Sequence, residues 1–387
     1  MFLNAKISIF CMQKTGSVNL PLHTGKCPKW LFPRMVKLSK EIVGFIVFEY
    51  GQEEFLRRIS NPCFFQSFGC VLGFDWHSSG LTTTVTGALK KALNNNSNEF
   101  GLFCAGGKGR ASKKTPEDIK IAVEKFNLSS KKEENLKNAS KLSAKVDNSL
   151  IQDGFQLYHH AFFISENGSW SVVQQGLNEE INYARRYHWL SFKTQSFVEE
   201  PHTGIHSKVF LENVLDLSSR ESKENREVSL DLLRENPNHL RGIFKNIFEN
   251  QKTLDNFISK NRIDSENVFT MQSSHLIPRM RERDYETLKK VYEMQPENYE
   301  SFIMVEGVGP KTIRALALVS QLIYGAKTSW NDPAKFSYAH GGKDRIPYPV
   351  DKVLIDENTE LLREALKQAK LGDFEKRNAL KRLCFVY

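Results

Sequence analysis

The chain has 387 residues, of which 40% are hydrophobic and 26% charged, and its 54 Lys and Arg exceed its 45 Asp and Glu by +9. This composition excludes a mainly disordered, collagen-like or disulfide-stapled protein, and the length predicts two or three domains. No apolar run approaches the roughly 20 residues of a membrane-spanning helix, so we expect no membrane partner. The basic balance suits nucleic acid, an anionic surface or acidic substrates.

The N-terminal segment and the cysteines indicate the compartment. The six cysteines include no Cys-x-x-Cys pair, and no signal peptide is recognisable in the sequence. We therefore expect a reduced, cytoplasmic protein. Residues 1–11 precede a second methionine, Met12. We expect them to be a disordered extension, either an upstream mis-start or a frayed arm.

For the first half of the chain, the sequence predicts a domain of mixed helices and strands. Within 12–105, an N-terminal α+β region, apolar residues recur at helical spacing from Trp30 to Tyr50 and a second helical stretch covers 53–58. Residues 106–148 are crowded with Lys, Glu, Asn and Ser, which predicts a charged helical arm or a linker. Residues 149–215 predict a β-hairpin around Asn167-Gly168 that completes the domain.

From residue 216 to residue 387 the apolar spacing is helical. The pattern predicts helices at 253–260, 284–294, 297–304, 310–324 and 357–383. The predicted fold class is therefore α+β: a mixed N-terminal domain with a β-hairpin or antiparallel sheet, followed by an all-α domain.

The segment Gly307-Val308-Gly309-Pro310-Lys311 is the most informative motif. Its glycines permit a tight turn, and Pro310 suits the first turn of the next helix. Free amides at a helix start, with basic side chains beside them, form a typical phosphate site. The region 297–324 thus resembles the DNA-binding helix–hairpin–helix of repair proteins, with a ligand-free corner between two helices as the alternative. The predicted nucleic-acid contacts are Gly307, Val308, Gly309, Lys311, Thr312 and Arg314.

The same motif resembles that of the helix–hairpin–helix DNA glycosylases. That family carries a catalytic Lys after the second glycine and an Asp in a downstream Val-Asp pair, which Lys311 and Val350-Asp351 match here. The resemblance implies a Schiff base between the lysine amine and a sugar carbon, supported by the carboxylate. The gap between the two positions is longer than in common members, so Lys311 as a phosphate contact is the preferred interpretation.

Histidines are concentrated in the front half, where seven of the ten precede residue 210. With nearby acids they could form a catalytic site of Asp75, His77, Asp153 and His159. They could also bind a divalent metal, Mg²⁺ or Mn²⁺, through Asp75, His77, His160 and His188. The alternative is that these side chains only satisfy buried hydrogen bonds. His159 and His160 are adjacent on a predicted strand and should point to opposite faces.

Two basic stretches extend the predicted DNA contacts. Lys108 and Arg110 lie in a glycine-rich loop that lacks a full P-loop pattern. Arg185 and Arg186 are interleaved with aromatic residues, as in surfaces that combine stacking with phosphate contact. A strand edge with stacked arginines is the alternative for the second pair.

Several strings together resemble a prokaryotic family known as domain-of-unknown-function family 763. They are Leu20–Pro28, Gly73–Gly80, Gly106–Gly109, Asp153–His160, Val172–Gly176, Ala184–Trp189, Gly307–Lys311 and Ala339–Gly342. The resemblance spans Met12 to Asp351 and implies no particular activity. We expect a protein that binds DNA backbone phosphate and acts in DNA processing or repair, as a metal-dependent nuclease. The alternatives are a glycosylase or lyase that uses Lys311 and Asp351, and a non-catalytic binding or recruitment protein.

Overall fold

The computed structural model describes residues 27–74, 79–207, 209–253, 269–271, 276–334 and 352–384. Its centre is a five-stranded antiparallel sheet in the order β1-β3-β4-β5-β6. The strands are β1 (Leu102–Lys108), β3 (Gln156–Ser165), β4 (Trp170–Asn178), β5 (Tyr183–Leu190) and β6 (Gly204–His206). The predicted hairpin is confirmed: β3 and β4 pair antiparallel, and Gly168 stands in their turn with φ +85°.

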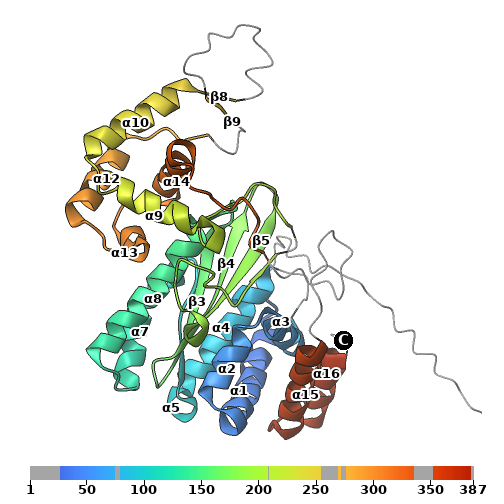
Figure 1. Cartoon of the computed structure of the whole chain (residues 1–387). Coiled ribbons are helices and arrows are strands. Elements are labelled where there is room, and N and C mark those ends of the chain that lie inside the picture. The colour runs from blue at the N-terminus through green and yellow to red at the C-terminus, as the bar shows by residue number, and fades with distance from the viewer. Residues whose placement is uncertain are drawn as a thin grey trace, which may run out of the picture.

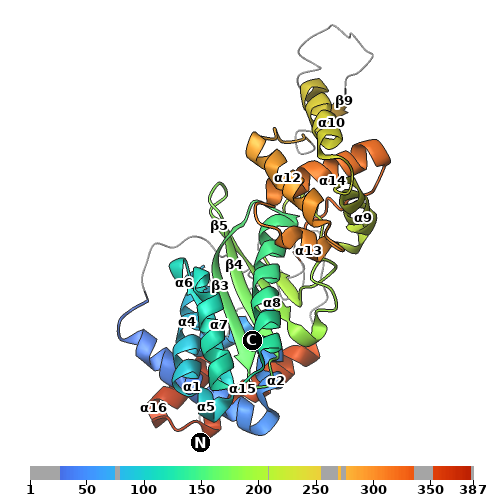
Figure 2. The same ribbon diagram turned by 90° about the vertical axis from the view of Figure 1, so that its left-hand side faces the viewer.

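Helices cover both faces of the sheet (Figures 1 and 2). One face packs on the front helices, and the last two helices, α15 and α16, pack in turn on α1 and α3; the other face packs on α7 and α8. Adjacent strand residues therefore enter different cores, with Phe162 in one and Phe163 in the other. The covering helices are α1 (Leu31–Tyr50), α2 (Gln52–Ile59), α3 (Pro62–Val71), α4 (Gly80–Asn95), α5 (Ser97–Phe100), α6 (Arg110–Lys113), α7 (Thr115–Lys125), α8 (Ser130–Ser149), α15 (Lys352–Gln368) and α16 (Asp373–Cys384).

The segment 106–148 is part of the front domain and is not a linker. Its last helix, α8, buries Leu136 and Val146 against the sheet while its Lys and Glu side chains face outward. The charged composition reflects the exposed side of this helix, and its apolar residues recur at helical spacing on the other side.

A helical part stands at one end of the sheet (Figure 2). Here α14 lies on α9, and α13 packs on both α8 and α9. Short strands accompany it: β2 (Ile151–Gln152) pairs with β7 (Leu215–Asp216), and β8 (Gln251–Thr253) pairs with β9 (Phe269–Met271). The helices are α9 (Lys223–Leu232), α10 (Pro237–Asn250), α12 (Glu282–Met294), α13 (Tyr299–Met304) and α14 (Pro310–Tyr324).

The α+β class is thus confirmed, and α14 has the predicted bounds. The predicted helix at 253–260 falls mostly outside the described residues, as does the extension 1–11. Within the part of the chain that the structure describes, no helix is both long and apolar enough to cross a bilayer.

Candidate nucleic-acid interface

The turn between α13 and α14 is built by its own sequence. Asn298 caps α13 by accepting a hydrogen bond from the Ser301 amide at 2.8 Å, and Pro310 opens α14. Gly307 adopts φ +92°, and a Cβ there would lie 2.6 Å from Thr287 Oγ1. Only glycine fits this position without strain.

Gly309 has a different role in the same turn. Its backbone is extended, and a Cβ placed on it would meet no heavy atom within 4 Å. The Ile313 amide bonds back to the Gly309 carbonyl at 3.1 Å. The amides of Lys311 and Thr312 therefore precede the hydrogen-bond ladder of α14. Neither the backbone conformation nor the packing requires a glycine at position 309. Because Gly309 has no side chain, the space beside the start of α14 is open.

Side chains from α8 and the following strand hold the carbonyl side of this turn. Lys145 Nζ donates to the Val308 carbonyl at 2.6 Å, and Gln152 Nε2 donates to the Pro310 carbonyl at 2.7 Å. The Val308 side chain is buried beneath them. The turn is therefore fixed to the front domain through its carbonyls.

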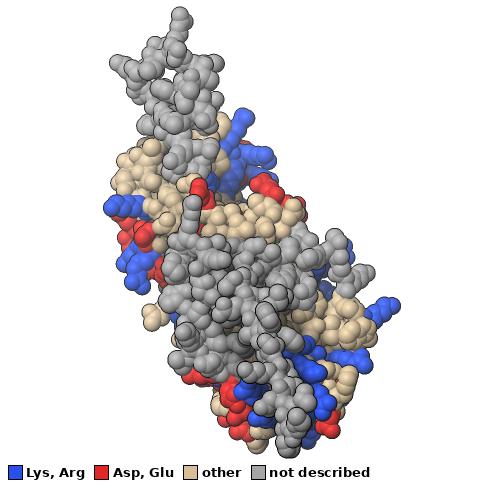
Figure 3. All heavy atoms as spheres, turned by 90° about the vertical axis from the view of Figure 1, so that its right-hand side faces the viewer, with Lys and Arg blue, Asp and Glu red and all other residues tan. Residues whose placement is uncertain are grey.

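A basic cavity adjoins the same turn. Its volume is about 530 Å³, and it is lined by Arg279, Met280, Arg281, Glu282, Arg283 and Lys311. The three arginines are exposed and Lys311 is partly buried. The first residues of α12 and of α14 thus line the same cavity. The positive ends of both helix dipoles therefore lie beside it. Figure 3 shows Lys and Arg side chains over the helical part, with Asp and Glu side chains among them.

Asp284 links these two helix starts. Its carboxylate accepts a hydrogen bond from the Arg281 amide at 2.7 Å and forms an ion pair with Lys311. Partial burial works to raise the pKa of Asp284, but the hydrogen bonds from Lys311 and Arg281 outweigh it and leave the pKa below its ordinary value. The ion pair places the Lys311 side chain between the two helix starts, a position that suits contact with a phosphate.

The structure corrects part of the predicted contact set. The side chains of Val308 and Thr312 are buried, so only their backbone could meet DNA. Arg314 is half-buried, lies over the Trp330 ring and donates to Gln152 Oε1 at 3.2 Å. Its guanidinium thus helps to dock the helical part. Asp351, the proposed partner of Lys311, lies outside the described residues.

The prediction that Arg185 and Arg186 contact nucleic acid is wrong, because both side chains are fully buried. Arg185 forms ion pairs with Asp153 and Asp332, each at 2.7 Å. Arg186 points to the opposite face, where it donates to His188 Nε2 at 2.9 Å. By contrast, Lys108 and Arg110 are exposed at the end of β1, where basic side chains remain accessible.

The members of the predicted histidine site that the structure describes, Asp153, His159, His160 and His188, do not lie together. His159 points toward α4 and lies 2.9 Å from Thr86 Oγ1, whereas His160 points toward α8 and lies 2.9 Å from Ser140 Oγ. His188 shares the face of His159, beside Phe65, so no ion could take both His160 and His188. Asp153 lies on the other face from His159, with Arg185. Asp75 and His77 lie outside the described residues.

Burial lowers the pKa of each of these histidines. The pKa of His159 falls to about 3, chiefly through desolvation, with smaller contributions from His160 and Lys108. The pKa of His188 falls well below its ordinary value for the same main reason, with Arg186 adding to the effect. These imidazoles are therefore neutral parts of the core at physiological pH.

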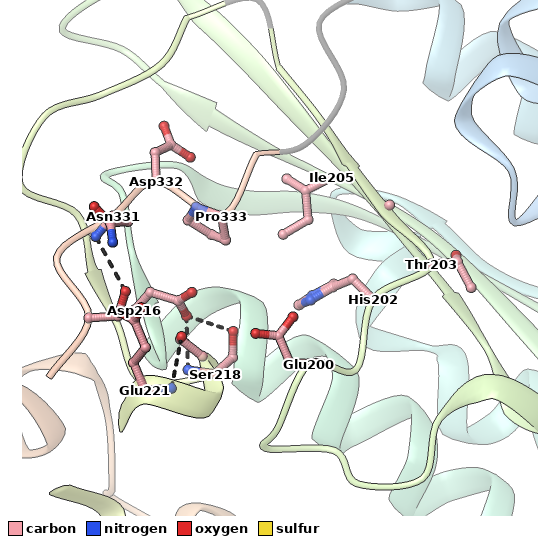
Figure 4. A pocket seen from close by; sticks show the side chains of 13 residues that line it. Glu200, His202, Thr203, Ile205, Asp216, Ser218, Glu221, Asn331, Asp332 and Pro333 are labelled. Carbon is pink, nitrogen blue, oxygen red and sulfur yellow. Dashed lines mark hydrogen bonds between the residues drawn. The ribbon is translucent and has the colours of Figure 1, made fainter. Parts of the chain in front are cut away.

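A second cavity was not predicted from the sequence. This polar cavity, of about 190 Å³, lies between β6, β7 and the segment after α14, and its lining includes Glu200, His202, Asp216, Ser218 and Asp332. Figure 4 shows Glu200, His202 and Asp216 directed toward a common space. Burial raises the pKa of Asp216, and Glu200 adds to the rise, against the hydrogen bonds from Ser218.

Behind this cavity lies Asp147, on the buried side of α8. Its Oδ1 is hydrogen-bonded to His202 Nε2, and its Oδ2 accepts from Trp189 Nε1 at 3.0 Å and from Gln174. Because residues 106–148 were predicted to be a charged helical arm or a linker, Asp147 was not predicted to be buried. The helical spacing of Ala139, Ser143 and Val146 on α8 was the signal that could have placed it inside.

Comparison with known proteins identifies the family. Residues 16–350 match the model of a family described as protein of unknown function, DUF763. The chain belongs to DUF763. No curated protein and no solved structure matches it. The family resemblance noted from the sequence is thereby confirmed, and the function has to be argued from the geometry.

Proposed function

We propose that this DUF763 protein binds DNA through its backbone phosphates at the basic cavity. The observation that carries the proposal is the meeting of the α12 and α14 starts around Arg279, Arg281, Arg283 and Lys311. Helix starts offer amides and positive dipole ends, and the guanidinium groups match phosphate oxygens in pairs.

The open space at Gly309 supports the same conclusion. A phosphate could approach the amides at the start of α14 closely, since no Cβ stands in the way. The turn is fixed from behind by Lys145 and Gln152, so the amides are held in place before a ligand arrives. Such contacts position a nucleic-acid backbone without reading its sequence.

Binding should therefore be weakly sequence-dependent and sensitive to salt. Fluorescence anisotropy with a labelled duplex of mixed sequence, repeated between 50 and 200 mM salt, measures both properties. We expect the double substitution Arg279→Ala/Arg283→Ala to reduce affinity by about tenfold and to lower the salt slope by about two. Gly309→Ala should also weaken binding without loss of stability.

Arg377→Ala is the matched control, because Arg377 is exposed on α16, away from the helical part. It should leave the affinity and the slope unchanged. Equal affinities for all variants would refute a site at the basic cavity. Stronger competition by RNA than by duplex DNA would refute DNA as the ligand.

The roles in DNA processing and repair stay predictions. Cleavage of labelled DNA in the presence of Mg²⁺ or Mn²⁺ tests the nuclease. Borohydride trapping on abasic DNA tests the lyase, for which the Lys311–Asp284 ion pair predicts no covalent adduct.

A further inference from the structure

A second group of basic side chains lies at the end of β1, outside the basic cavity. This β1 group consists of Lys108, Arg110, Lys113 and Lys114, and each of the four is exposed. Within the part of the chain that the structure describes, no carboxylate forms an ion pair with any of them. Their charge is therefore available to a polyanion, and a cluster of accessible cations is the electrostatic feature that phosphate backbones select.

The turn that carries the β1 group is held by its own backbone. The Gly109 amide donates to the Tyr158 carbonyl at 2.8 Å, and Ser112 Oγ donates to the Gly109 carbonyl at 2.7 Å. Gly109 has φ +56°, and a Cβ on it would meet no heavy atom within 4 Å. Lys108 Nζ lies 5.7 Å from the centroid of the Tyr158 ring. A ligand can thus approach the turn closely, and little ordering of the backbone opposes its binding.

Strand pairing places this turn at the end of the sheet on which the helical part stands. Lys108 pairs with His159 of β3, and His159 follows Gln152 by seven positions. Gln152 in turn donates to the Pro310 carbonyl at the start of α14. Seven residues span at most about 25 Å, and paired strands lie about 5 Å apart, so Lys108 is within about 30 Å of Gln152. Figure 2 shows α6 at the end of the front domain nearer to the helical part.

We propose that one DNA duplex contacts both the basic cavity and the β1 group, so that the preferred ligand is a duplex of at least about one helical turn. This inference rests on the proposed function. A turn of B-form DNA advances about 34 Å, which is enough for one duplex to bridge the two regions. Two modest phosphate contacts on one ligand reinforce each other, because the second forms at the high effective concentration that the first creates.

Duplex length tests this inference. Hairpin duplexes of about 6 and 16 base pairs cover roughly 20 and 54 Å, so only the longer probe reaches both regions. Fluorescence anisotropy with each probe gives the increase in affinity on lengthening the duplex. This increase should be about tenfold smaller in Lys108→Ala/Arg110→Ala than in wild type. Additional binding registers on the longer probe favour both proteins equally, so the difference between them reports the second contact.

Lys367→Ala/Arg377→Ala is the matched control, because it removes the same charge from exposed positions on α15 and α16, away from the helical part (Figure 1). It should leave the length dependence as in wild type. The inference is wrong if Lys108→Ala/Arg110→Ala shows the wild-type length dependence, or if the control loses as much. All four positions are exposed, so both variants should fold, which circular dichroism verifies.

The inference and the proposed function fail in different ways. Arg279→Ala/Arg283→Ala should weaken binding of the shorter probe whether or not the β1 group contributes. Such a loss, together with an unchanged length dependence in Lys108→Ala/Arg110→Ala, supports the basic cavity and overturns the bridging duplex. An unchanged affinity of Arg279→Ala/Arg283→Ala for both probes overturns both, because the duplex then does not lie at the basic cavity.

Discussion

Gly307 and Gly309 are two residues apart, but their backbone conformations and surroundings differ. Gly307 has φ +92° and leaves no room for a Cβ beside Thr287, whereas Gly309 is extended and open. We expect Gly307→Ala to lower the free energy of unfolding by about 1–3 kcal/mol, because it adds backbone strain and a clash. Gly309→Ala should change it by less than about 0.5 kcal/mol. Urea unfolding of both variants tests this; equal losses would contradict the assigned roles.

The buried histidines predict a pH dependence of stability. The pKa of each lies below its ordinary value in the folded chain, so the unfolded chain binds more protons as the pH falls below about 6.5. Stability present above that pH should be lost on acidification, toward the folded pKa of about 3 for His159. Each imidazole contributes up to about 1.4 kcal/mol per pH unit in this window. The four are His159, His160, His188 and His206.

Urea unfolding between pH 7.5 and 5 measures this slope. His159→Gln should reduce it by up to about 1.4 kcal/mol per pH unit. Asp153 acts in the opposite direction, since burial raises its pKa to about 6 and the folded chain then takes up its proton first. A slope that is unchanged in His159→Gln would show that this imidazole is not held neutral.

At the scale of elements, α8 connects the sheet with the turn before α14. Its buried side carries Asp147 and Ser140, which bond to His202 and His160, and two lysines reach the turn. Lys145 donates to Val308 O at 2.6 Å, and Lys141 donates to Met304 O at 3.4 Å. This helix therefore positions the basic cavity relative to the sheet.

Lys145→Met should loosen the turn. Loss of its hydrogen bond should cost about 1 kcal/mol of stability and speed amide exchange in residues 305–312. Hydrogen exchange read by mass spectrometry measures the change. Lys141→Met is the control, because its contact is longer and more exposed. Equal exchange in both variants would mean that Lys145 does not hold the turn.

At the scale of the molecule, the segment after α14 ties the helical part to the sheet. Asp332 forms an ion pair with Arg185 of β5 and accepts a hydrogen bond from the Leu211 amide at 2.8 Å. The Asp216 amide donates to the Ser329 carbonyl at 3.0 Å. These contacts also form one wall of the polar cavity.

Asp332→Asn should therefore destabilise the whole fold. Removing one charge from a buried ion pair typically costs about 3 kcal/mol, whereas an exposed pair contributes less than about 1 kcal/mol. Glu360→Gln, in the exposed pair with Arg363 on α15, is the comparison. Urea unfolding followed by circular dichroism should separate the two variants. Similar urea midpoints for the two variants would show that this segment does not stabilise the fold through Asp332.

Local patterns in the sequence determined several elements of this protein. The Asn-Gly turn specified the β3–β4 hairpin, and apolar spacing placed α1 and α14. The glycine and proline positions marked the turn at 305–309. These features depend on neighbours within a few residues, which is why the chain order alone reveals them.

Only the tertiary structure decided which charges are inside. Arg185 and Arg186 read as surface residues, yet the sheet is covered on both faces and buries them. The basic cavity joins residues 279–283 to Lys311, and the polar cavity joins Asp216 to residues 200–202 and 329–333. Burial and charge pairing depend on segments far apart in the chain, so composition and spacing could not place either cavity.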